Sequence, residues 1–563
     1  MSEAAPASTG SRTVADLLPR AAELFGERPA IRHKQGEEWR DLSFAALHED
    51  AAAVGRGLLA LGAEPGERVC VLATTRPEWT VADFGVCMAG AAVVPIYPTS
   101  SPEECAWVIG DSGARTVICA GPEQVAKVEA VRGELPSLRE VLSIEPGTGD
   151  LDLDELRRLG AAIEPATLAA RIAAVAPEDL YTIIYTSGST GPPKGCVHTH
   201  RTYRAAITSV TSREVFHGGE DLVYLFLPLA HSFALIVQLA ALDSGTTVAY
   251  SAGDPQRILA ELAEVRPTFL PSVPRIFEKI YRAVGAERLR GDGPDEALVA
   301  KVRAVFGGRL REASSGGAPI AREVLEFFWQ CGIPVMEGYG LTETGTAVTV
   351  SRPDAHRFGT VGRAVPGIEI RIAADGEVML RGESIFSGYH GNPEASAAAL
   401  PGGWLATGDL GSLDADGYLT IAGRKKDIII TAGGKNIAPS NLENDMRQSR
   451  WVSYAVLHGD RRPYPVLLLT LDWDEVLAWA REEGIEDVSP SALAGDPRVR
   501  ALVAADLDRA NARYARSEQA KRFTILEREL SAERGELTAS LKVRRAEVER
   551  LHSQRFEALY QER

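Results

Sequence analysis

The sequence predicts an α/β protein: a large N-terminal domain of two packed α/β lobes plus a small β-barrel-like unit, followed by a small α+β C-terminal domain. Its 563 residues exceed what one hydrophobic core organises. Strand and helix patterns alternate through most of the chain, which is typical of largely parallel sheets. Between residues 360 and 420, short strands joined by Asp-Gly and Gly-rich turns replace this alternation.

Residues 13–121 form the first part of the alternating pattern. Apolar residues at helical spacing predict helices in TVADLLPRAAELF and LSFAALHEDAAAVGRGLLAL. β-branched runs predict strands in RVCVLAT and ARTVICAG, and WTVADFGVCMAGAAVVPIY predicts a buried helix followed by a strand. In the second lobe the pattern predicts a strand at 222–227, helices at 255–264 and 273–281, and a strand at 309–314.

One window, residues 222–242, is long enough to cross a bilayer and carries no formal charge. Pro228, His231 and Gln238 interrupt it, so we expect a buried strand, a loop and a helix from Phe233 instead. We therefore expect a soluble protein with at most peripheral membrane contact.

A charged connector, GRKKD at 423–427, is the predicted hinge between an N-terminal domain at 13–422 and a C-terminal domain at 428–563. The Ala/Ser/Thr/Pro-rich residues 1–12 are expected to be a disordered lead. In the C-terminal domain we expect strands at VSYAVLH and VLLLTL, helices at 473–483 and 496–515, and a charged helix from about residue 543.

Composition excludes several classes of protein. The formal net charge of -16 argues against a nucleic-acid partner, because phosphate backbones require a broad cationic field. The six cysteines lack CxxC or zinc spacing, so neither a disulfide framework nor a metal cluster is implied. The N-terminus lacks the features of a signal peptide. We therefore expect a cytoplasmic protein.

The stretch YTSGSTGPPKG, at 185–195, follows an apolar β-branched run and predicts a strand that ends in a phosphate-binding loop. It is not a Walker A loop, because Pro193 stands where that motif has its second Gly. A flexible Ser/Gly connector is the alternative. Glycine backbone freedom, hydroxyl donors and one cation suit a polyphosphate. The residues that supply them are Thr186, Ser187, Gly188, Ser189, Thr190, Gly191 and Lys194.

Three further clusters suit a nucleotide. In EGYGLTETG, at 337–345, Gly338 and Gly340 flank Tyr339, whose ring could stack on a flat ligand, and Glu343 offers an oxygen ligand for Mg²⁺.

SSGGAP, at 314–319, follows a strand and could form a backbone wall for the same ligand through Gly316, Gly317 and Ala318. Asp409 in TGDL could bind a ribose diol with Arg424 close behind, although a structural turn and a salt bridge would leave the same pattern. Lys542, in ELTASLKVRR, would be read as a solvated tail residue from spacing alone.

Five blocks in this order resemble the adenylate-forming superfamily, which includes acyl-CoA synthetases, adenylation domains and firefly luciferase: YTSGSTGPPKG, GYGLTE, TGD, GRKKD and the terminal lysine motif. RPEW, LPLAHSFA, VPRIFEKIY and GGKNIAPSNLE resemble its long-chain fatty acyl-CoA synthetase branch. Leu541 departs from the Gly that frequently precedes the lysine in that family.

The resemblance implies a ligase that activates a fatty, medium- to long-chain, carboxylic acid with ATP as acyl-AMP. It then transfers the acyl group to coenzyme A. The residues 186–191 and Lys194 would hold the departing phosphates, Thr342 the α-phosphate and Glu343 the Mg²⁺ ion. Tyr339 and Gly317 would hold adenine.

The same resemblance places Asp409 and Arg424 at the ribose, and Lys542 between carboxylate and phosphate. A mobile C-terminal domain would rotate about Lys426 between the half-reactions, and Gly433 and Gly434 would line the thiol path. His231 would flank the acyl entrance with Phe277, and a core His and a core Phe are the alternative.

Two other functions fit the same sequence. An acyl-AMP ligase could load a separate acyl carrier protein, or the enzyme could activate a carboxylic acid that is not fatty. A regulatory nucleotide-binding relative would lack catalytic groups, whereas Glu343, Asp409 and Lys542 are present.

Overall fold

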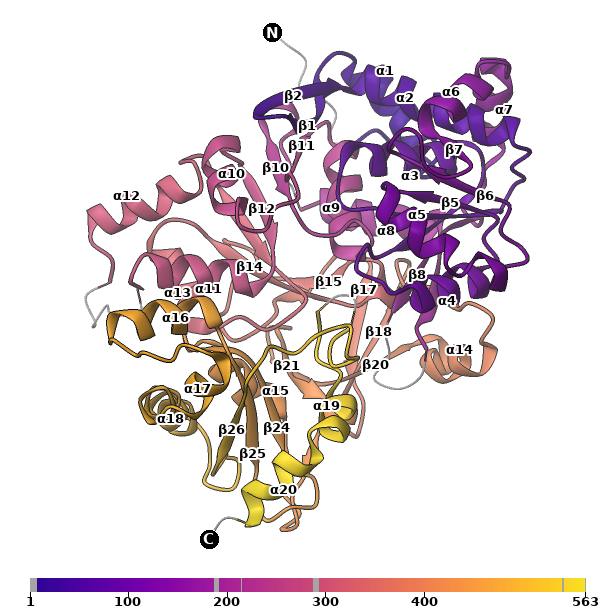
Figure 1. Cartoon of the computed structure of the whole chain (residues 1–563). Helices are drawn as coiled ribbons and strands as arrows, with labels where there is room; N and C mark the ends of the chain where they lie inside the picture. The colour runs from indigo at the N-terminus through magenta and orange to yellow at the C-terminus, as the bar shows by residue number, and fades with distance from the viewer. Residues whose placement is uncertain (1–7, 187–191, 214, 287–292, 539–540, 562–563) are drawn as a thin grey trace.

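The computed structural model describes residues 8–186, 192–213, 215–286, 293–538 and 541–561. Figure 1 shows two α/β lobes side by side, with the C-terminal residues, orange to yellow, packed below them. The lobes contain an eight-stranded and a nine-stranded sheet, and a four-stranded antiparallel sheet forms the small additional unit. The predicted α/β fold class is confirmed.

The eight-stranded sheet of the first lobe has the order β19-β9-β8-β4-β3-β5-β6-β7. Its central strands are parallel and buried on both faces, which is why they are almost continuously apolar. The strands are β3 Arg68–Leu72, β4 Ala92–Ile96, β5 Thr116–Cys119, β6 Glu140–Ser143, β7 Leu151–Asp152, β8 Leu180–Thr186, β9 Lys194–Thr199 and β19 Gly388–Tyr389. The helices are α1 Leu17–Phe25, α2 Phe44–Ala60, α3 Pro77–Met88, α4 Pro102–Ser112, α5 Pro122–Glu129, α6 Leu153–Gly160, α7 Pro165–Ala174 and α8 His200–Thr211.

The nine-stranded sheet of the second lobe has the order β16-β15-β14-β13-β12-β10-β11-β1-β2. Its strands are β1 Pro29–Gln35, β2 Glu38–Ser43, β10 Leu222–Leu225, β11 Thr247–Tyr250, β12 Phe269–Ser272, β13 Glu312–Ser315, β14 Val335–Gly340, β15 Ala347–Val350 and β16 Arg363–Ala364. Its helices are α9 Ser232–Asp243, α10 Ile258–Val265, α11 Pro274–Ala283, α12 Glu296–Val305 and α13 Arg322–Gln330.

Two buried helices, α3 and α9, join the lobes. Thr80 on α3 donates its hydroxyl to Gln238 Oε1 on α9 at 2.8 Å, and the Tyr250 hydroxyl on β11 donates to the same oxygen at 2.6 Å. Because the apolar window at 222–242 becomes β10, a turn and α9, the predicted strand, loop and helix are confirmed. Among the described residues, no helix combines the length and apolar character needed to cross a membrane.

The start of the chain has two features that the local sequence patterns do not reveal. The hairpin β1–β2 joins the second lobe, where Ile31 pairs with Val248, because it covers the edge that β11 would otherwise expose. Residues 8–12 are ordered, although the sequence predicts a disordered lead over 1–12. The Thr9 N–H donates to the carbonyl of Asp243 at 2.9 Å, and this contact holds the segment in place. Residues 1–7 lie outside the described part of the chain.

The small unit and the C-terminal domain follow in sequence. The four-stranded sheet consists of β17 Ile368–Ile372, β18 Glu377–Gly382, β20 Leu405–Leu413 and β21 Leu419–Arg424, with α14 Pro393–Ala399 before β20. The C-terminal strands are β22 Ile429–Ile430, β23 Asn436–Ile437, β24 Val452–His458, β25 Val466–Leu471 and β26 Phe523–Leu526. The C-terminal helices are α15 Pro439–Arg447, α16 Trp473–Glu482, α17 Pro490–Gly495, α18 Pro497–Asn511, α19 Arg545–Leu551 and α20 Ser553–Gln561.

Candidate active site

The predicted phosphate loop connects two antiparallel strands. Thr186 ends β8 and pairs with Lys194, the first residue of β9. The Lys194 ammonium lies 5.1 Å from the centre of the Tyr389 ring, a cation–π contact that draws the side chain toward β19. At the end of the loop, Trp107 on α4 donates its indole N–H to the Pro193 carbonyl at 2.9 Å. The predicted phosphate ligands Ser187, Gly188, Ser189, Thr190 and Gly191 lie outside the described residues.

A short 3₁₀ turn, Thr342–Thr344, presents the predicted metal ligand. The carbonyl of Thr342 accepts a hydrogen bond at 2.7 Å from Nε2 of His198, which must carry the proton because a carbonyl only accepts. Burial lowers the pKa of His198 to about 4, so the ring is neutral near pH 7. The Tyr389 hydroxyl donates to Glu343 Oε1 at 2.7 Å. Both contacts fix the turn that carries Thr342 and Glu343.

The predicted ribose residues Asp409 and Arg424 are partners across β20 and β21. Asp409 is 3% exposed, and its carboxylate accepts from Arg424 Nε at 2.9 Å and from the Tyr339 hydroxyl at 2.6 Å. Burial raises the pKa of Asp409, while Arg424 and Tyr339 act in the opposite direction. The TGD and GYG motifs therefore meet through one buried carboxylate.

The predicted adenine wall, Gly316 to Ala318, follows β13. Gly317 has a φ of +81°, which side chains other than glycine rarely adopt. A Cβ on Gly316 would lie 3.4 Å from the Phe233 ring, so α9 closes one side of this loop. Gly338 and Gly340 lie in β14 beside it, and a Cβ on Gly340 would lie only 2.3 Å from the carbonyl oxygen of Thr346. Close backbone packing thus explains Gly340.

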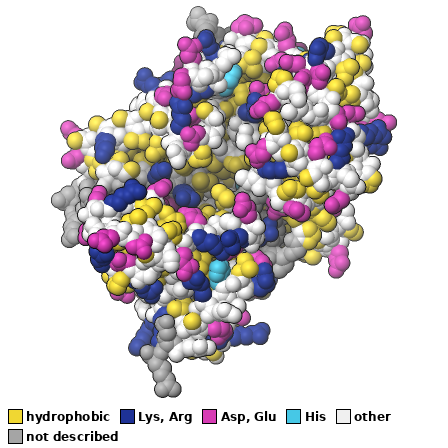
Figure 2. Space-filling view, in the orientation of Figure 1, with side chains coloured by type: hydrophobic (Ala, Val, Ile, Leu, Met, Phe, Trp, Pro, Cys, Tyr) yellow, Lys and Arg dark blue, Asp and Glu magenta, His cyan; other side chains and the backbone are white. Residues whose placement is uncertain are grey.

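Lys542 reaches this site from the C-terminal domain. Burial and the neighbouring Arg424 lower the pKa of Lys542, while Asp409 and Glu343 raise it. Burial and then Lys542 lower the pKa of His231 to about 3. The Lys542 side chain keeps contact with solvent although charged protein groups lie near it. In Figure 2 this face of the molecule is hollowed near its centre, where the parts of the chain meet.

A tight turn holds the backbone of Lys542. Its N–H donates to Thr538 Oγ1 at 3.0 Å, and its carbonyl accepts from the Thr538 N–H at 2.8 Å. Leu541 has a φ of +59°, in the left-handed region that favours glycine. The turn geometry therefore accounts for the frequent Gly at this position in the family that the sequence resembles.

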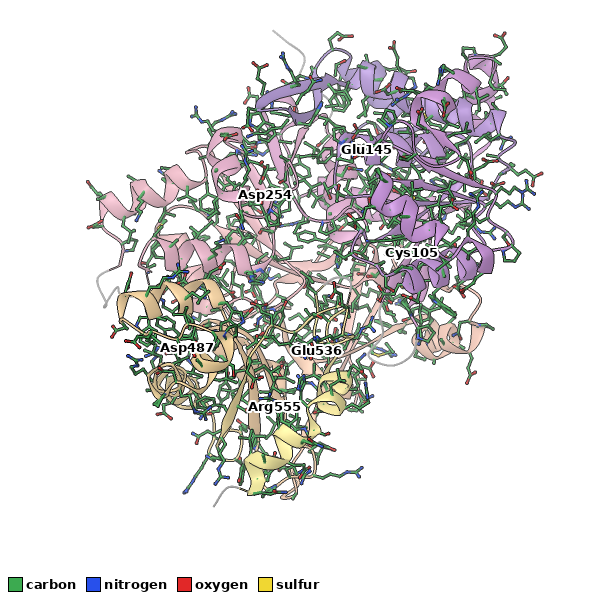
Figure 3. The ribbon with its side chains drawn as sticks, viewed as in Figure 1. Cys105, Glu145, Asp254, Asp487, Glu536 and Arg555 are labelled. Atoms are coloured by element: carbon green, nitrogen blue, oxygen red, sulfur yellow. The ribbon has the colours of Figure 1, made fainter. Side chains whose placement is uncertain are left out.

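The buried carboxylate of Glu536 anchors the segment that leads to this turn. It accepts from both terminal nitrogens of Arg528 at 2.7 Å and from His552 Nε2 at 2.7 Å. Burial opposes its ionisation, but Arg528, His552 and the Ser531 N–H outweigh burial and hold the pKa of Glu536 at about 2. Figure 3 labels Glu536 in this segment.

Two further residues predicted for the site are His231 and Phe277. His231 caps α9, where its Nδ1 accepts from the Phe233 N–H at 3.1 Å. Phe277 is fully buried in the core of the second lobe, its ring centre 5.7 Å from that of Phe328, which favours the alternative of a core phenylalanine; its place beside an acyl entrance stays a prediction. Packing against α13 holds it inside.

The predicted hinge at Lys426 and the predicted thiol path at Gly433 and Gly434 follow the small sheet in the sequence. Burial and Arg424 lower the pKa of Lys426. Gly433 and Gly434 form a turn in which the Gly434 N–H donates to the Thr431 carbonyl at 2.8 Å. This turn belongs to the C-terminal domain, between β22 and β23.

Sequence reasoning missed the residues that hold the motifs together. Tyr389, His198 and Trp107 lie outside the five motif blocks, and each contacts one of them across the fold. His198 follows the phosphate loop in CVHTH, which was the one local signal available. The two others come from β19 and α4, whose positions depend on tertiary structure.

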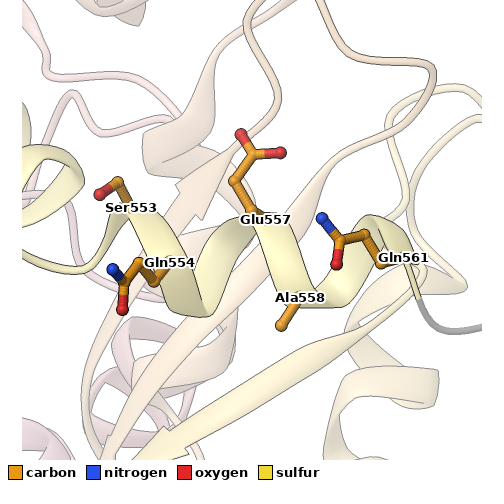
Figure 4. A pocket seen from close by; sticks show the side chains of 5 residues that line it. All are labelled: Ser553, Gln554, Glu557, Ala558 and Gln561. Atoms are coloured by element: carbon orange, nitrogen blue, oxygen red, sulfur yellow. The ribbon is translucent and has the colours of Figure 1, made fainter.

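A second hollow lies elsewhere. A depression of about 300 Å³ is lined by one face of α20, at Ser553, Gln554, Glu557, Ala558 and Gln561 (Figure 4). It contains none of the predicted site residues. The candidate active site is therefore the cluster around Glu343 and Asp409.

The groups around Glu343 fit a magnesium ion that is held mainly by substrate phosphates. No group of three or more His, Cys, Asp or Glu side chains in the described ranges is arranged to hold a metal ion. Mg²⁺ in nucleotide enzymes is bound by one or two carboxylates together with substrate phosphates. A single carboxylate that is oriented by Tyr389 fits that pattern.

Comparisons with known proteins define the class. The model of the AMP-binding enzyme family matches residues 18–390, and the model of the AMP-binding enzyme C-terminal domain matches residues 426–563. The chain therefore belongs to the AMP-binding enzymes, the adenylate-forming superfamily that its motifs resemble.

Two relatives with similarity over most of their length carry the names of long-chain acyl-CoA ligases or synthetases. The chain is 38% identical to the long-chain-fatty-acid–CoA ligase FadD15 of Mycobacterium tuberculosis, over 93% of this chain and 92% of that protein. It is 30% identical to the peroxisomal long chain acyl-CoA synthetase 7 of Arabidopsis thaliana, over 98% of this chain and 86% of that protein.

Solved structures share the fold. The A domain of a carboxylic acid reductase from Segniliparus rugosus, in complex with AMP and a co-purified carboxylic acid, has a TM-score of 0.82 at 22% identity, over 98% of this chain and 95% of that chain. O-succinylbenzoate coenzyme A synthetase from Bacillus subtilis, in complex with ATP and magnesium ion, has a TM-score of 0.69 at 22% identity, over 94% and 98%.

Proposed function

We propose that this protein is an ATP-dependent acid–thiol ligase that activates a medium- to long-chain fatty acid as acyl-AMP and transfers the acyl group to coenzyme A. The observation that supports the proposal is the electrostatic interaction of Lys542, from the C-terminal domain, with Arg424, Asp409 and Glu343 of the large domain. The ligase names of relatives at 38% and 30% identity support the fatty acid and coenzyme A as substrates.

In the first half-reaction a carboxylate oxygen attacks the α-phosphorus of ATP. The new bond joins that oxygen to phosphorus, the bond from phosphorus to the bridging oxygen breaks, and pyrophosphate leaves with the electron pair. Both reactants are anionic, so alignment and charge neutralisation supply most of the catalysis. Lys542 is assigned to the carboxylate and the α-phosphate, and Lys194 to the departing phosphates.

The nucleotide is held by the groups that the fold brings together. Asp409 already accepts from Arg424 and Tyr339, and a carboxylate has about four acceptor positions, so it retains capacity for ribose hydroxyls. The ring of Tyr339 and the backbone at Gly317 are assigned to adenine. Thr342 is assigned to the α-phosphate.

Magnesium is assigned to Glu343, which the Tyr389 hydroxyl orients. When bound, the ion neutralises phosphate charge and polarises the phosphoryl oxygens. The solved relative with ATP and magnesium ion supports this cofactor.

In the second half-reaction the thiol of coenzyme A displaces AMP from the acyl carbon. We assign the connector at Lys426 as the hinge. Lys425 is anchored in the small sheet by Asp375 at 2.6 Å and Glu377 at 3.0 Å, while Ile429 is buried in the C-terminal core. The backbone between these anchors is where a rotation would be absorbed. Gly433 and Gly434 are assigned to the thiol path in the rotated state.

The substrate series is the decisive experiment. AMP release is measured with short-, medium- and long-chain fatty acids and with aromatic acids, each with coenzyme A or with a holo-acyl carrier protein. We expect the highest activity with medium- to long-chain fatty acids and coenzyme A. Thioester on the carrier alone would assign the carrier-loading function, and turnover of aromatic acids alone would refute a fatty substrate. Absence of acid-dependent ATP–pyrophosphate exchange would refute the ligase assignment.

A further inference from the structure

Helix α4 contacts two parts of the candidate site that are distant in sequence. Glu104 Oε1 on α4 accepts a hydrogen bond from Arg544 of the C-terminal domain at 3.1 Å. One turn further along the helix, Trp107 donates to the Pro193 carbonyl at the end of the phosphate loop. Residues three apart on a helix lie on the same face. One face of α4 therefore touches the C-terminal domain and the phosphate loop together.

The α4 end of the contact is pre-organised. Ser101 and Glu104 form a capping box, in which Glu104 Oε2 accepts from the Ser101 N–H at 3.3 Å. The positive end of the helix dipole also favours a carboxylate in the first turn. Glu104 is thus oriented by its own helix, with its second oxygen directed to Arg544. Figure 3 labels the next residue, Cys105, on this helix.

The Arg544 end of the contact is rigidly joined to Lys542. The Arg544 N–H donates to the carbonyl of Glu536 at 2.8 Å, and Leu537 and Val543 form a β-bridge. Lys542 is bound to Thr538 on the opposite side of the same turn. Fixing the Arg544 guanidinium therefore fixes the backbone from which the Lys542 side chain extends.

We propose that α4 is the docking platform of the adenylate-forming state, in which Glu104 acts on Lys542 through Arg544 as a positioning residue, and Trp107 positions the phosphate loop. The inference rests on the proposed ligase function, and Glu104 and Trp107 lie outside the motif blocks. Both partners of the pair are about one-third exposed, at 31% for Arg544 and 30% for Glu104. Exposed pairs are weak and screened by salt, which suits a contact that must break in each cycle.

The test separates the two half-reactions. Acyl-AMP formation from fatty acid and ATP is measured in single turnover, and thioester formation is measured from supplied acyl-AMP and coenzyme A. Glu104→Gln keeps an oxygen for the Ser101 cap but loses the charge. We expect this variant and Arg544→Gln each to slow the first half-reaction about fivefold, which is about 1 kcal/mol, and to leave the second unchanged.

Controls come from the same helix and from charge exchange. Glu103→Gln removes an equal charge from the same turn, where the Glu103 carboxylate accepts from the Ser101 hydroxyl, so we expect normal rates. The exchanged pair Glu104→Arg with Arg544→Glu should recover the first half-reaction to within about twofold. Salt should reduce the difference between the wild type and Glu104→Gln, because screening weakens the contact that the substitution removes.

The contact between Trp107 and Pro193 is tested by a separate measurement. Trp107→Phe keeps an aromatic ring and loses the N–H donor, so we expect a raised KM for ATP with a smaller change in kcat. Equal first-half rates for wild type, Glu104→Gln and Arg544→Gln would overturn the positioning role, as would equal slowing of both half-reactions. An unchanged KM for Trp107→Phe would overturn the loop-positioning role. Wild-type protein that forms no acyl-AMP would instead refute the proposed function on which the inference rests.

Discussion

Replacing Lys542 with alanine is the most direct test of the active-site geometry. Without substrates, the attractions of Glu343 and Asp409 for the ammonium oppose the repulsion from Arg424. Removing the charge should therefore change the free energy of unfolding by no more than about 0.5 kcal/mol. In the transition state, a unit charge about 4 Å away at an effective dielectric constant near 20 contributes about 4 kcal/mol. That is a loss of roughly a thousandfold in the rate of acyl-AMP formation.

The assay follows each half-reaction in the same preparation. ATP–pyrophosphate exchange in the presence of a fatty acid reports the first step, and thioester formation from supplied acyl-AMP reports the second. We expect Lys542→Ala to abolish most of the exchange and to leave thioester formation largely intact. Equal losses in the two assays, with an unchanged unfolding midpoint, would refute the assignment of Lys542 to the first step.

The pH dependence provides an independent check on the same residue. Burial and Arg424 lower the pKa of Lys542, and the first step requires its charged form. Acyl-AMP formation by the wild type should therefore fall as pH rises through that lowered pKa. In Lys542→Arg, whose side chain stays charged, the alkaline fall should disappear. An identical alkaline fall in both proteins would mean that another group titrates.

Three further predictions follow from contacts near the site. Tyr389→Phe removes the hydrogen bond that orients Glu343, and we expect about 10- to 100-fold more Mg²⁺ to reach half-maximal activity. Glu536→Gln should reduce the free energy of unfolding by about 3 kcal/mol at pH 7, because it removes a buried carboxylate bound to Arg528. The folded-state pKa of Glu536, about 2, lies below the ordinary 4.5, so in the wild type this stabilisation is complete above about pH 4.5 and is lost as pH falls toward 2. Leu541→Gly relieves a left-handed residue that is 55% exposed, so we expect a gain in unfolding free energy of about 0.5 to 1 kcal/mol.

Each of these predictions has a matched control. Tyr389→Phe should not change the KM for the fatty acid, and an unchanged Mg²⁺ requirement would contradict the role given to its hydroxyl. For Glu536→Gln, the free energy of unfolding is compared with that of the wild type between pH 7 and pH 2. A difference between the two proteins that is the same at pH 2 as at pH 7 would contradict stabilisation by the ionised Glu536 carboxylate. Leu541→Ala keeps a Cβ and should not produce the gain, so an equal gain in both variants would exclude backbone strain as its cause.

Local sequence patterns were sufficient for most elements. The helix and strand periods located β3, β5, α2, α9, β24 and β25, because each buries one continuous or alternating apolar face in its own stretch of chain. The Asp-Gly turns between residues 360 and 420 predicted the small antiparallel sheet. The motif blocks also named Glu343, Asp409 and Arg424, since their side-chain chemistry is visible without coordinates.

Partner choice across the fold depended on tertiary structure. The sequence gives no sign that β1 and β2 cross to the second lobe, since strand register is set by the edge that a hairpin covers. Composition likewise predicted disorder in residues 8–12, which hydrogen bonds to Asp243 hold in place.

The sequence by itself determined which residue types are available for adenylate chemistry, and the tertiary structure decided which of them meet. Lys542 lies 199 positions after Glu343 in the sequence. Only the docking of the C-terminal domain brings the two side chains into one electrostatic cluster. Tyr389 and Glu104 carry no local motif, because each acts through a partner that is distant in sequence. Side-chain chemistry is a property of the chain, whereas proximity between distant segments is a property of packing.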